Sequence, residues 1–335
     1  MSKRKITVIP GDGIGPSIIE SAIQILTHAG CDFEYEYADA GLVALEKHGE
    51  LLPQATLDLI EKNKVTLKGP LTTPVGGGFT SINVSLRKKF NLYANVRPVL
   101  SFKGTRSRYD NIDIITVREN TEGMYSGAGQ KRSDDNQSAE AMSIITREGA
   151  ERIVKFAFEL ARQEGRRKVT IIHKANILKS TSGLFLEVAR EVASRYPDIQ
   201  SEEMIVDAAC MNLVMYPERF DVMVTTNLFG DILSDLCAGL VGGLGMAPGA
   251  NIGDGAAIFE AVHGSAPDIA GKNIANPTSV ILASIQMLEY LGMQDKAERI
   301  REAVRATIES GDRVTRDLGG SASTSEFTQS IIERL

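Results

Sequence analysis

Short apolar runs and amphipathic segments alternate along the chain. Residues 5–9 (KITVI) are apolar enough for a buried strand, and a segment with helical spacing follows the next turn and continues to about residue 29. Pro16 stands where a helix tolerates proline, in its first turn. The N-terminal segment is therefore predicted to form a strand, a glycine-rich turn and a helix.

The same alternation continues to the C-terminus. Further strands are predicted at 33–37, 65–71, 112–117, 168–174 and 220–227. Further helices are predicted at 40–48, 53–62, 147–164, 179–195, 278–292, 295–310 and 324–335. Strands that alternate with helices favour an α/β fold.

Two stretches interrupt this pattern. Residues 128–140 (AGQKRSDDNQSAE) are polar and are expected to form an exposed excursion. Residues 240–255 are rich in glycine and contain a proline, which predicts a hinge or crossover rather than a helix or strand. A chain of 335 residues also exceeds what one hydrophobic core normally organises, so two lobes are expected, with a boundary near residue 100, where Pro98 ends one unit.

Composition narrows the class of protein. The chain has 43% hydrophobic and 24% charged residues, which is typical of a globular protein. A net charge of -6 argues against a general affinity for nucleic acid or anionic membranes, and the sequence contains no apolar run of the roughly 18 residues that a membrane span needs. Three cysteines without a C-x-x-C pair favour a reducing compartment: the cytoplasm, or the mitochondrial matrix of a eukaryote if a targeting segment has been removed.

Neither glycine-rich stretch matches a nucleotide-binding fingerprint. In the turn that contains Gly11, Gly13 and Gly15, the third glycine of a G-x-G-x-x-G motif would fall at Pro16. A tight structural turn is therefore favoured over a Rossmann site. The glycines at 76–78 lack the following Gly-Lys-Ser/Thr of a phosphate-binding loop, so ATP is not indicated.

The stretch after these glycines predicts an anion site. Ser81 and Asn83 precede a predicted helix, where hydroxyl, amide and free backbone N–H groups are available to an anion. Arg87 lies one turn further on and Arg97 follows, and guanidinium groups bind carboxylates bidentately. The alternative is an N-capped helix with solvated basic residues, and for the lysines at 88–89 this alternative is preferred.

Two more candidate groups follow predicted strands, where ligands bind in α/β sheets. Arg118 ends one strand, and Tyr125 comes seven residues later, able to give or take a proton if nearby cations lower its pKa. Lys174 and Asn176 end another strand, and this lysine could donate a proton or polarise an oxygen. The alternatives are a packed tyrosine and a lysine exposed at a turn.

The strongest indication of a metal site is the segment NLFGDILSD. Asp231 and Asp235 are spaced i, i+4 and share one helical face, where their charges repel unless a cation lies between them. Asp207, an acid among apolar neighbours, could complete the set. Carboxylates without cysteine or histidine favour Mg²⁺ or Mn²⁺ over zinc. Spacing alone leaves metal binding and favourable placement of acids at a helix start open.

A final segment, 259–271 (FEAVHGSAPDIAG), is rich in small residues and contains one histidine, and Asn276 follows it. Small residues let a flat ligand approach the backbone. Residue chemistry alone does not distinguish a ligand-binding segment from an ordinary loop.

In their shared order these motifs resemble the isocitrate/isopropylmalate family of β-decarboxylating dehydrogenases, from residue 5 almost to the C-terminus. NLFGDILSDL followed by VGGLGMAPGANIG resembles the family's metal-site signature, and SINVSLR resembles its isocitrate branch, where the serine and asparagine meet an extra carboxylate. The resemblance implies a two-lobed α/β fold with a mixed central sheet that is not a Rossmann fold. Its large domain would be 1–99 and 254–335, and its small domain 100–253.

The resemblance also implies roles for individual residues. The catalytic residues would be Tyr125, Lys174 and Asp207. The substrate-binding residues would be Thr73, Ser81, Asn83, Arg87, Arg97, Arg118 and Asn176. The cofactor-binding residues would be Thr72, His263, Gly264, Ser265, Ala266, Asp268, Ile269 and Asn276. The ligands of Mg²⁺ or Mn²⁺ would be Asp207, Asp231 and Asp235. The family further implies a homodimer in which the neighbouring chain supplies Lys174 and Asp207 to each site.

The implied reaction is the NAD-dependent oxidation and decarboxylation of isocitrate to 2-oxoglutarate and CO2, a step of the tricarboxylic acid cycle. Relatives that use NADP carry lysine and tyrosine where this chain has Asp268 and Ile269, and an acid repels a 2′-phosphate but accepts from ribose hydroxyls. Alternatives are a homoisocitrate, 3-isopropylmalate or tartrate dehydrogenase of the same family, a non-catalytic regulatory subunit, and a plain Rossmann reductase, which Pro16 disfavours.

Overall fold

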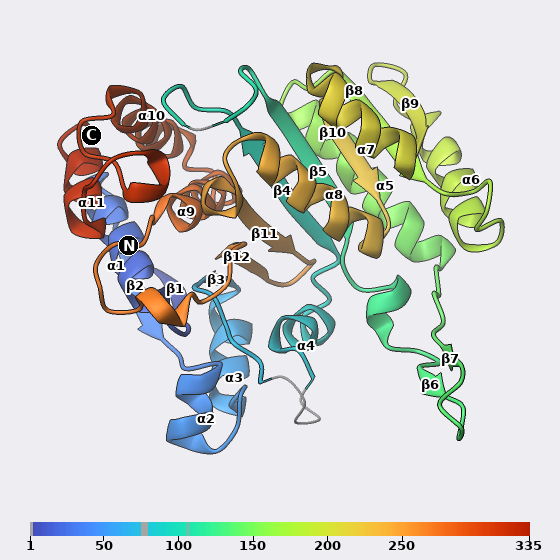
Figure 1. The fold of residues 1–335 in the computed structure, drawn as a ribbon, viewed down its shortest axis with the longest axis horizontal. Coiled ribbons are helices and arrows are strands. Elements are labelled where there is room, and N and C mark those ends of the chain that lie inside the picture. The colour runs from blue at the N-terminus through green and yellow to red at the C-terminus, as the bar shows by residue number, and fades with distance from the viewer. Residues whose placement is uncertain (1–2, 75–79, 106) are drawn as a thin grey trace.

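A mixed sheet of ten strands runs through the molecule (Figure 1). The computed structural model describes residues 3–74, 80–105 and 107–335. Across the sheet the strands are β2 (Phe33–Tyr37), β1 (Arg4–Ile9), β3 (Val65–Lys68), β12 (Ala257–Ala261), β11 (Pro248–Ile252), β4 (Ala94–Leu100), β5 (Asp113–Glu119), β10 (Val222–Thr225), β8 (Lys168–His173) and β9 (Gln200–Ile205). Neighbouring strands are parallel in both outer parts, whereas β12, β11, β4 and β5 pair antiparallel. The expected α/β fold with a mixed central sheet is confirmed.

Helices cover the sheet in two groups, one over each half (Figure 1). The first half carries α1 (Gly15–His28), α2 (Leu42–His48), α3 (Gln54–Asn63), α4 (Ile82–Lys89), α9 (Thr278–Tyr290), α10 (Gln294–Ser310) and α11 (Thr324–Ile332). The second half carries α5 (Arg147–Gln163), α6 (Thr181–Ala193), α7 (Val206–Met215) and α8 (Asn227–Leu240). The predicted excursion at 128–140 is an exposed hairpin of β6 (Lys131–Arg132) and β7 (Ala139–Glu140) that projects from the second half. The domain boundaries at 99/100 and 253/254 stay a prediction.

The helices form where the apolar positions recur with helical spacing. In α5, Ile153, Val154, Ala157 and Phe158 are fully buried, and Thr146 begins the helix by accepting a hydrogen bond from the Gly149 amide. Each large apolar side chain buried in this way contributes about 1.5–3 kcal/mol. A single core cluster extends from β1 through the middle of the sheet to β8 and thereby holds both halves together.

Two expectations for the chain path are wrong. Residues 240–255, expected to be a hinge or crossover, contain strand β11, because pairing with β12 and β4 stabilises a segment of weak strand propensity. Residues 259–261 belong to strand β12 rather than to a loop. Pro98 lies inside β4, which is tolerated because β11 pairs with β4 only as far as Val96.

The sequence pattern also gave no indication of strand β9 or of helix α7 as separate elements. Within 3–74, 80–105 and 107–335, no helix is both long and apolar enough to span a membrane.

Candidate active site

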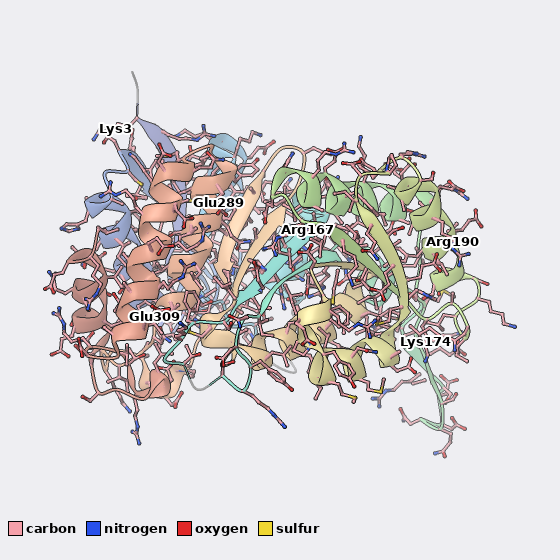
Figure 2. The ribbon with its side chains drawn as sticks, turned by 90° about the horizontal axis from the view of Figure 1, so that it is seen from above. Lys3, Arg167, Lys174, Arg190, Glu289 and Glu309 are labelled. Carbon is pink, nitrogen blue, oxygen red and sulfur yellow. The ribbon has the colours of Figure 1, made fainter. Side chains whose placement is uncertain are left out.

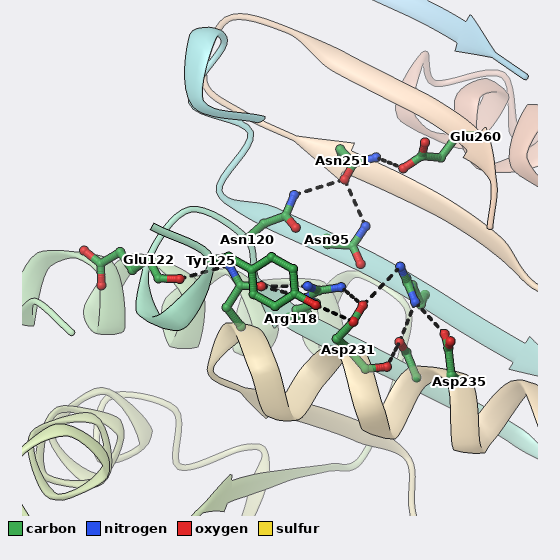
Figure 3. Close-up of polar contacts among 12 residues, drawn as sticks. Asn95, Arg118, Asn120, Glu122, Tyr125, Asp231, Asp235, Asn251 and Glu260 are labelled. Carbon is green, nitrogen blue, oxygen red and sulfur yellow. Dashed lines mark hydrogen bonds and ion pairs between the residues drawn. The ribbon is translucent and has the colours of Figure 1, made fainter. Parts of the chain in front are cut away.

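A buried guanidinium at the carboxyl end of β5 organises the site (Figure 3). Arg118 is 1% exposed, and its Nε and Nη2 donate to Asn227 Oδ1 at 3.0 and 2.7 Å while Nη1 donates to Asp231. Both partners lie on α8. A Cβ added to Gly230 would lie 2.5 Å from Arg118 Cγ, so only glycine lets the first turn of α8 approach the arginine this closely. Sequence reasoning assigned Arg118 and Asp231 to the site but gave Asn227 no role.

A second guanidinium comes from β4. Arg97 Nη1 donates to Ser234 Oγ at 2.6 Å and to Asp235 Oδ1 at 3.0 Å, and Nη2 lies 3.9 Å from Asp231 Oδ1. Arg97 Nε is buried and has no hydrogen-bond partner in the described part of the chain. Ser234, which fixes the arginine, was not anticipated from the sequence.

Tyr125 lies on the 3-10 helix η1 (Gly123–Ser126) and closes the site from another side. Its hydroxyl donates to Asp231 Oδ2 at 2.6 Å, and its ring stacks 4.9 Å from the Arg118 guanidinium carbon. Burial raises the pKa of Tyr125, and the hydrogen bond to Asp231 raises it further, which outweighs the neighbouring cations. The cations therefore do not bring the pKa of Tyr125 below its ordinary value, which was the condition set from the sequence, and the phenol is protonated at neutral pH.

Arg87 on α4 brings a third cation. Burial lowers its pKa, and so does the charge of Arg97. Burial and the charge of Arg87 lower the pKa of Arg118 to about 10, so Arg118 still carries its charge at neutral pH. Three cations at one end of the sheet attract a polyanion, and the predicted substrate arginines do come together.

Asp231 and Asp235 lie one turn apart on α8, as predicted. Neither caps the helix, because α8 begins at Asn227 and its N-terminus has no side-chain cap. Burial raises the pKa of Asp231, but Arg118 and Tyr125 outweigh burial and leave the pKa below its usual value. The side chains of Asp231 and Asp235 are 36% and 54% exposed, and their oxygens are the ligands that Mg²⁺ and Mn²⁺ prefer.

Asp207 does not join these two acids within one chain. It lies in the first turn of α7 and forms an ion pair with Lys174, which lowers the pKa of Asp207. Within 3–74, 80–105 and 107–335, no three His, Cys, Asp or Glu side chains come close enough together to hold a metal ion. Lys174 lies in the second half of the molecule, near its edge, and Asn176 beside it is exposed (Figure 2).

The glycine turn after β1 has a structural role, in line with the preference for a tight turn over a Rossmann site. The carboxylate of Asp12 accepts hydrogen bonds from the amides of Leu42 and Val43, which begin α2, and from the Thr72 amide at 2.7 Å. The turn also supports the predicted cofactor segment, because the Ile14 amide donates to the Ser265 carbonyl at 2.8 Å. A Cβ at Gly13, where φ is +59°, would lie 2.0 Å from that same oxygen.

The predicted cofactor residues lie on one segment and its neighbours. The Thr72 and Ser265 hydroxyls are 2.7 Å apart. Burial lowers the pKa of His263, and its Nε2 is a buried atom without a partner among the residues described. Gly264 and Asp268 are exposed, and Ala266 and Ile269 are half-buried around the 3-10 helix η4 (Pro267–Ile269).

Asn276 is buried, and its amide is already engaged. Its Nδ2 donates to Asp317 Oδ2 at 2.8 Å, and its Oδ1 accepts from the amide and hydroxyl of Thr278. Asp317, which also acts electrostatically on His263, was not anticipated, because an isolated acid in a glycine-rich turn gives no distinctive spacing.

The predicted residues at the start of α4 are open to a ligand. Ser81 is exposed at the N-cap position, but its side chain makes no capping bond, so the alternative of a simple N-cap does not hold. Thr73 Oγ1 instead accepts from the Ile82 amide at 3.4 Å, and the buried Oδ1 of Asn83 has no partner in the ranges described. The glycines at 76–78 lie outside the described residues.

Comparison with known proteins agrees with this geometry. A family model described as isocitrate/isopropylmalate dehydrogenase matches residues 5–331. The chain belongs to this family. It is 51% identical over 330 residues to a mitochondrial NAD isocitrate dehydrogenase, catalytic subunit 5, of Arabidopsis thaliana, covering 98% of this chain and 88% of that protein. It is also 51% identical over 332 residues to a 3-isopropylmalate dehydrogenase of Archaeoglobus fulgidus, covering 99% of both. A crystal structure of isocitrate dehydrogenase from Methylococcus capsulatus superposes with a TM-score of 0.95 at 56% identity, covering 99% of both chains.

The dehydrogenase also contains a buried polar row that sequence reasoning missed, and Figure 3 shows its members Asn95, Asn120, Asn251 and Glu260. Lys68 and Glu260 pair at 2.6 Å, Glu260 accepts from Asn251 Nδ2 at 2.7 Å, and Asn251 Oδ1 accepts from Asn95 and Asn120, each at 3.0 Å. Burial raises the pKa of Glu260, but Lys68 and Arg87 outweigh burial and lower it to about 2. The row crosses the centre of the sheet beside the arginine cluster. Single asparagines in β4 and β11 and just after β5 give no pattern in the sequence.

Proposed function

We propose that this dehydrogenase uses NAD to oxidise and decarboxylate isocitrate to 2-oxoglutarate and CO2. The observation that carries the proposal is the convergence of Arg87, Arg97 and Arg118 on one end of the sheet beside two carboxylates. A substrate with three carboxylates matches three guanidiniums better than a dicarboxylate does. The reaction would belong to the tricarboxylic acid cycle, in the cytoplasm or in the mitochondrial matrix.

In this mechanism the arginines orient the substrate carboxylates. Lys174 of the partner subunit, through the partner's Asp207, would take the proton of the substrate hydroxyl. Bound NAD would supply the hydride acceptor. Loss of CO2 from the resulting β-carboxylated 2-oxo acid leaves an electron pair on carbon, and the protonated phenol of Tyr125 supplies the proton that replaces the carboxylate. Asp231 and Asp235, with Asp207 of the partner subunit, would hold Mg²⁺ or Mn²⁺, which stabilises negative charge on substrate oxygens.

The preference for NAD rests on Asp268. Its exposed carboxylate can accept from ribose hydroxyls, and it would repel a 2′-phosphate by about a few kcal/mol at close range. The unpartnered Nε2 of His263 leaves a ring nitrogen available to the cofactor. Several relatives, including the Arabidopsis subunit, carry NAD in their names.

A shared-site homodimer is supported by the surface of α7 and α8. Apolar side chains that are exposed there are Met211, Val214, Met215, Leu228 and Ile232. Contiguous exposed apolar residues on packed helices mark an interaction surface. Because Asp207 begins α7, a partner bound on this surface would bring its Lys174 and Asp207 toward the Asp231 and Asp235 of the first chain.

The second candidate is 3-isopropylmalate dehydrogenase, because the Archaeoglobus relative is as similar as the Arabidopsis one. The exposed hydroxyl of Ser81 and the unpartnered Oδ1 of Asn83 favour a polar substituent over an isopropyl group. Homoisocitrate and tartrate remain sister substrates for the same test. A regulatory subunit is disfavoured because Tyr125, Lys174 and the three aspartates are all present.

The decisive measurement is the initial rate of the purified chain with isocitrate, under NAD and under NADP, with Mg²⁺ or Mn²⁺ and with a chelator. We expect turnover of isocitrate, a preference for NAD, and loss of activity with the chelator. The same assay with 3-isopropylmalate, homoisocitrate and tartrate serves as the comparison. Faster turnover of any of these, or no turnover by the chain alone, would overturn the proposal.

A further inference from the structure

One contact links the helix of Arg87 to the turn of Tyr125. Lys88 Nζ on α4 donates to the main-chain carbonyl of Ser126 at 3.1 Å. Ser126 directly follows Tyr125 and is the last residue of η1. Lys88 is exposed, as expected from the sequence, but it also bridges two elements from different halves of the molecule. Figure 1 shows α4 below the sheet and the segment before β6 facing it.

The acceptor is a natural place for a cation. The last carbonyls of a helix have no partner within the helix and carry partial negative charge. Gly127, in the left-handed conformation at φ +73°, ends η1, and the Ala128 amide donates to Ser126 Oγ at 3.2 Å. The end of the turn is therefore held by Gly127 on one side and by Lys88 on the other.

The contacts of the Tyr125 side chain itself involve groups that the substrate and the metal ion would bind. Its hydroxyl donates to Asp231, and its ring lies against Arg118. Both contacts would be altered by a cation bound at Asp231 and a carboxylate bound at Arg118. The Lys88 contact lies outside this set and is free to persist while the others exchange.

We propose that Lys88 is a positioning residue that ties the Tyr125 turn to α4, so that binding of a substrate carboxylate by the adjacent Arg87 also fixes the phenol. The inference rests on the proposed function, because it concerns the proton that Tyr125 delivers after decarboxylation. Arg87 is buried toward the site while the next residue, Lys88, is exposed and reaches the opposing turn, so one helix serves both contacts.

The competing explanation is a solvated lysine that merely adds positive charge near an anionic substrate. Lys89 provides the matched control, because it is the next residue, is equally exposed and carries the same charge without this contact. Removing either charge weakens attraction of the substrate to a similar extent. Only removal of Lys88 loosens the turn.

The test compares Lys88→Met, Lys88→Arg and Lys89→Met in the full chain. For each variant kcat and KM for isocitrate are measured, together with the exchange of the carbon 3 protons of 2-oxoglutarate with D2O, which reports the Tyr125 step without net turnover. We expect Lys88→Met to slow exchange and kcat roughly three- to tenfold, the loss of one partly exposed charged hydrogen bond, with a smaller change in KM. Lys88→Arg should restore most of the rate, and Lys89→Met should match the wild type.

Backbone amide exchange of residues 123–127, followed by mass spectrometry without substrate, gives an independent readout. It should be faster in Lys88→Met alone. Equal behaviour of Lys88→Met and Lys89→Met, or a rise in KM with kcat unchanged, would refute the positioning role. If the wild type does not turn over isocitrate, the proposed function fails, and amide exchange then decides whether Lys88 anchors the turn.

Discussion

Asp231 accepts hydrogen bonds from a guanidinium and a phenol at once, and together with burial this arrangement keeps Tyr125 protonated. The pKa of the phenol lies above its ordinary value because of burial and of Asp231, whereas the pKa of the acid lies below its ordinary value. The phenol therefore keeps its proton across the neutral range and loses it only when the pH rises above its elevated pKa. Tyr125 can therefore act as a proton donor.

Tyr125→Phe removes this proton donor while it keeps the ring against Arg118. We expect decarboxylation to fall by about a hundredfold or more, the usual contribution of a general acid, and hydride transfer to a supplied β-carboxylated 2-oxo acid to fall much less. Stopped-flow measurement of NADH oxidation and CO2 release separates the two half-reactions. Equal loss of both would contradict the assignment.

Glu260 and Lys68 form a buried pair whose energetic value can also be tested. Lys68→Met leaves a buried carboxylate without its main partner and should lower the free energy of unfolding by about 3–5 kcal/mol. Lys62→Met, which removes an exposed partner of Glu36, is the control and should cost less than about 1 kcal/mol. Chemical denaturation at pH 7 measures both. Adding Glu260→Gln to Lys68→Met should recover part of the loss.

The sign of the pH dependence follows from the direction of the shift. The folded pKa of Glu260 is about 2, below the ordinary 4.5, so the wild-type pair contributes its full stability above pH 4.5 and loses it as the pH falls through about 2. In Lys68→Met the folded pKa rises, and the penalty should shrink as the pH falls. A penalty that stays constant between pH 7 and 5 would show that packing rather than charge is responsible.

Among single residues, the sequence predicted those whose chemistry is specific. Arg87, Arg97, Arg118, Tyr125, Asp231 and Asp235 were assigned to the site, and the structure brings them together. It did not predict Asn227, Ser234 or Asn251. Amides and hydroxyls are common throughout folded chains, and only the hydrogen-bond partners that they have in the folded chain show their role.

At the scale of elements, the glycine turn between β1 and α1 supports the predicted cofactor segment. Gly13→Ala would place a Cβ 2.0 Å from the Ser265 carbonyl at a positive φ, so the segment must move. We expect KM for NAD to rise several-fold while KM for isocitrate changes little, together with a loss of stability of about 1 kcal/mol or more.

Gly49→Ala is the matched control for this change. Gly49 also has a positive φ, +77°, but no atom of the described chain lies within 4 Å of an added Cβ. It should lower stability without changing KM for NAD. A similar KM in both variants would show that the turn and the cofactor segment are not coupled.

Elements with strong periodicity were predicted, and those stabilised by their neighbours were not. β1, β8 and α5 follow from apolar spacing alone. β11 (PGANI) has a weak local preference and exists because β12 and β4 flank it. β9 (QSEEMI) is an edge strand whose acids pair with Lys168 and Arg190, so it lacks the apolar character of the inner strands.

At the scale of the whole molecule, Lys174 and Asp207 pair with each other and not with Tyr125, Asp231 or Asp235 of the same chain. Sequence spacing cannot say which chain completes a site, because it carries no information on how two copies pack. The exposed apolar residues of α7 and α8 are what supports the proposal that a second chain completes the site. A dimer with shared sites makes a prediction that a monomer does not.

Coexpression of Tyr125→Phe with Lys174→Met tests it. Each variant alone should be nearly inactive. In a mixed dimer one site receives both defects and the other receives none, so random pairing at equal expression should restore about a quarter of the wild-type activity. Copurification of the two chains over two different affinity tags confirms the mixed dimers. Absence of any recovery, with mixed dimers present, would place Lys174 and Tyr125 in the same chain's site.

The polar row across the centre of the sheet has a consequence for protein engineering. Lys68, Asn95 and Glu260 fall in the expected large domain, and Asn120 and Asn251 fall in the small one. A chimaera that exchanges one domain with that of a relative keeps only three or two of these five bonding partners from each parent. Recombination at residues 99 and 253 will give folded hybrids only between parents that have equivalent residues at the positions of the polar row.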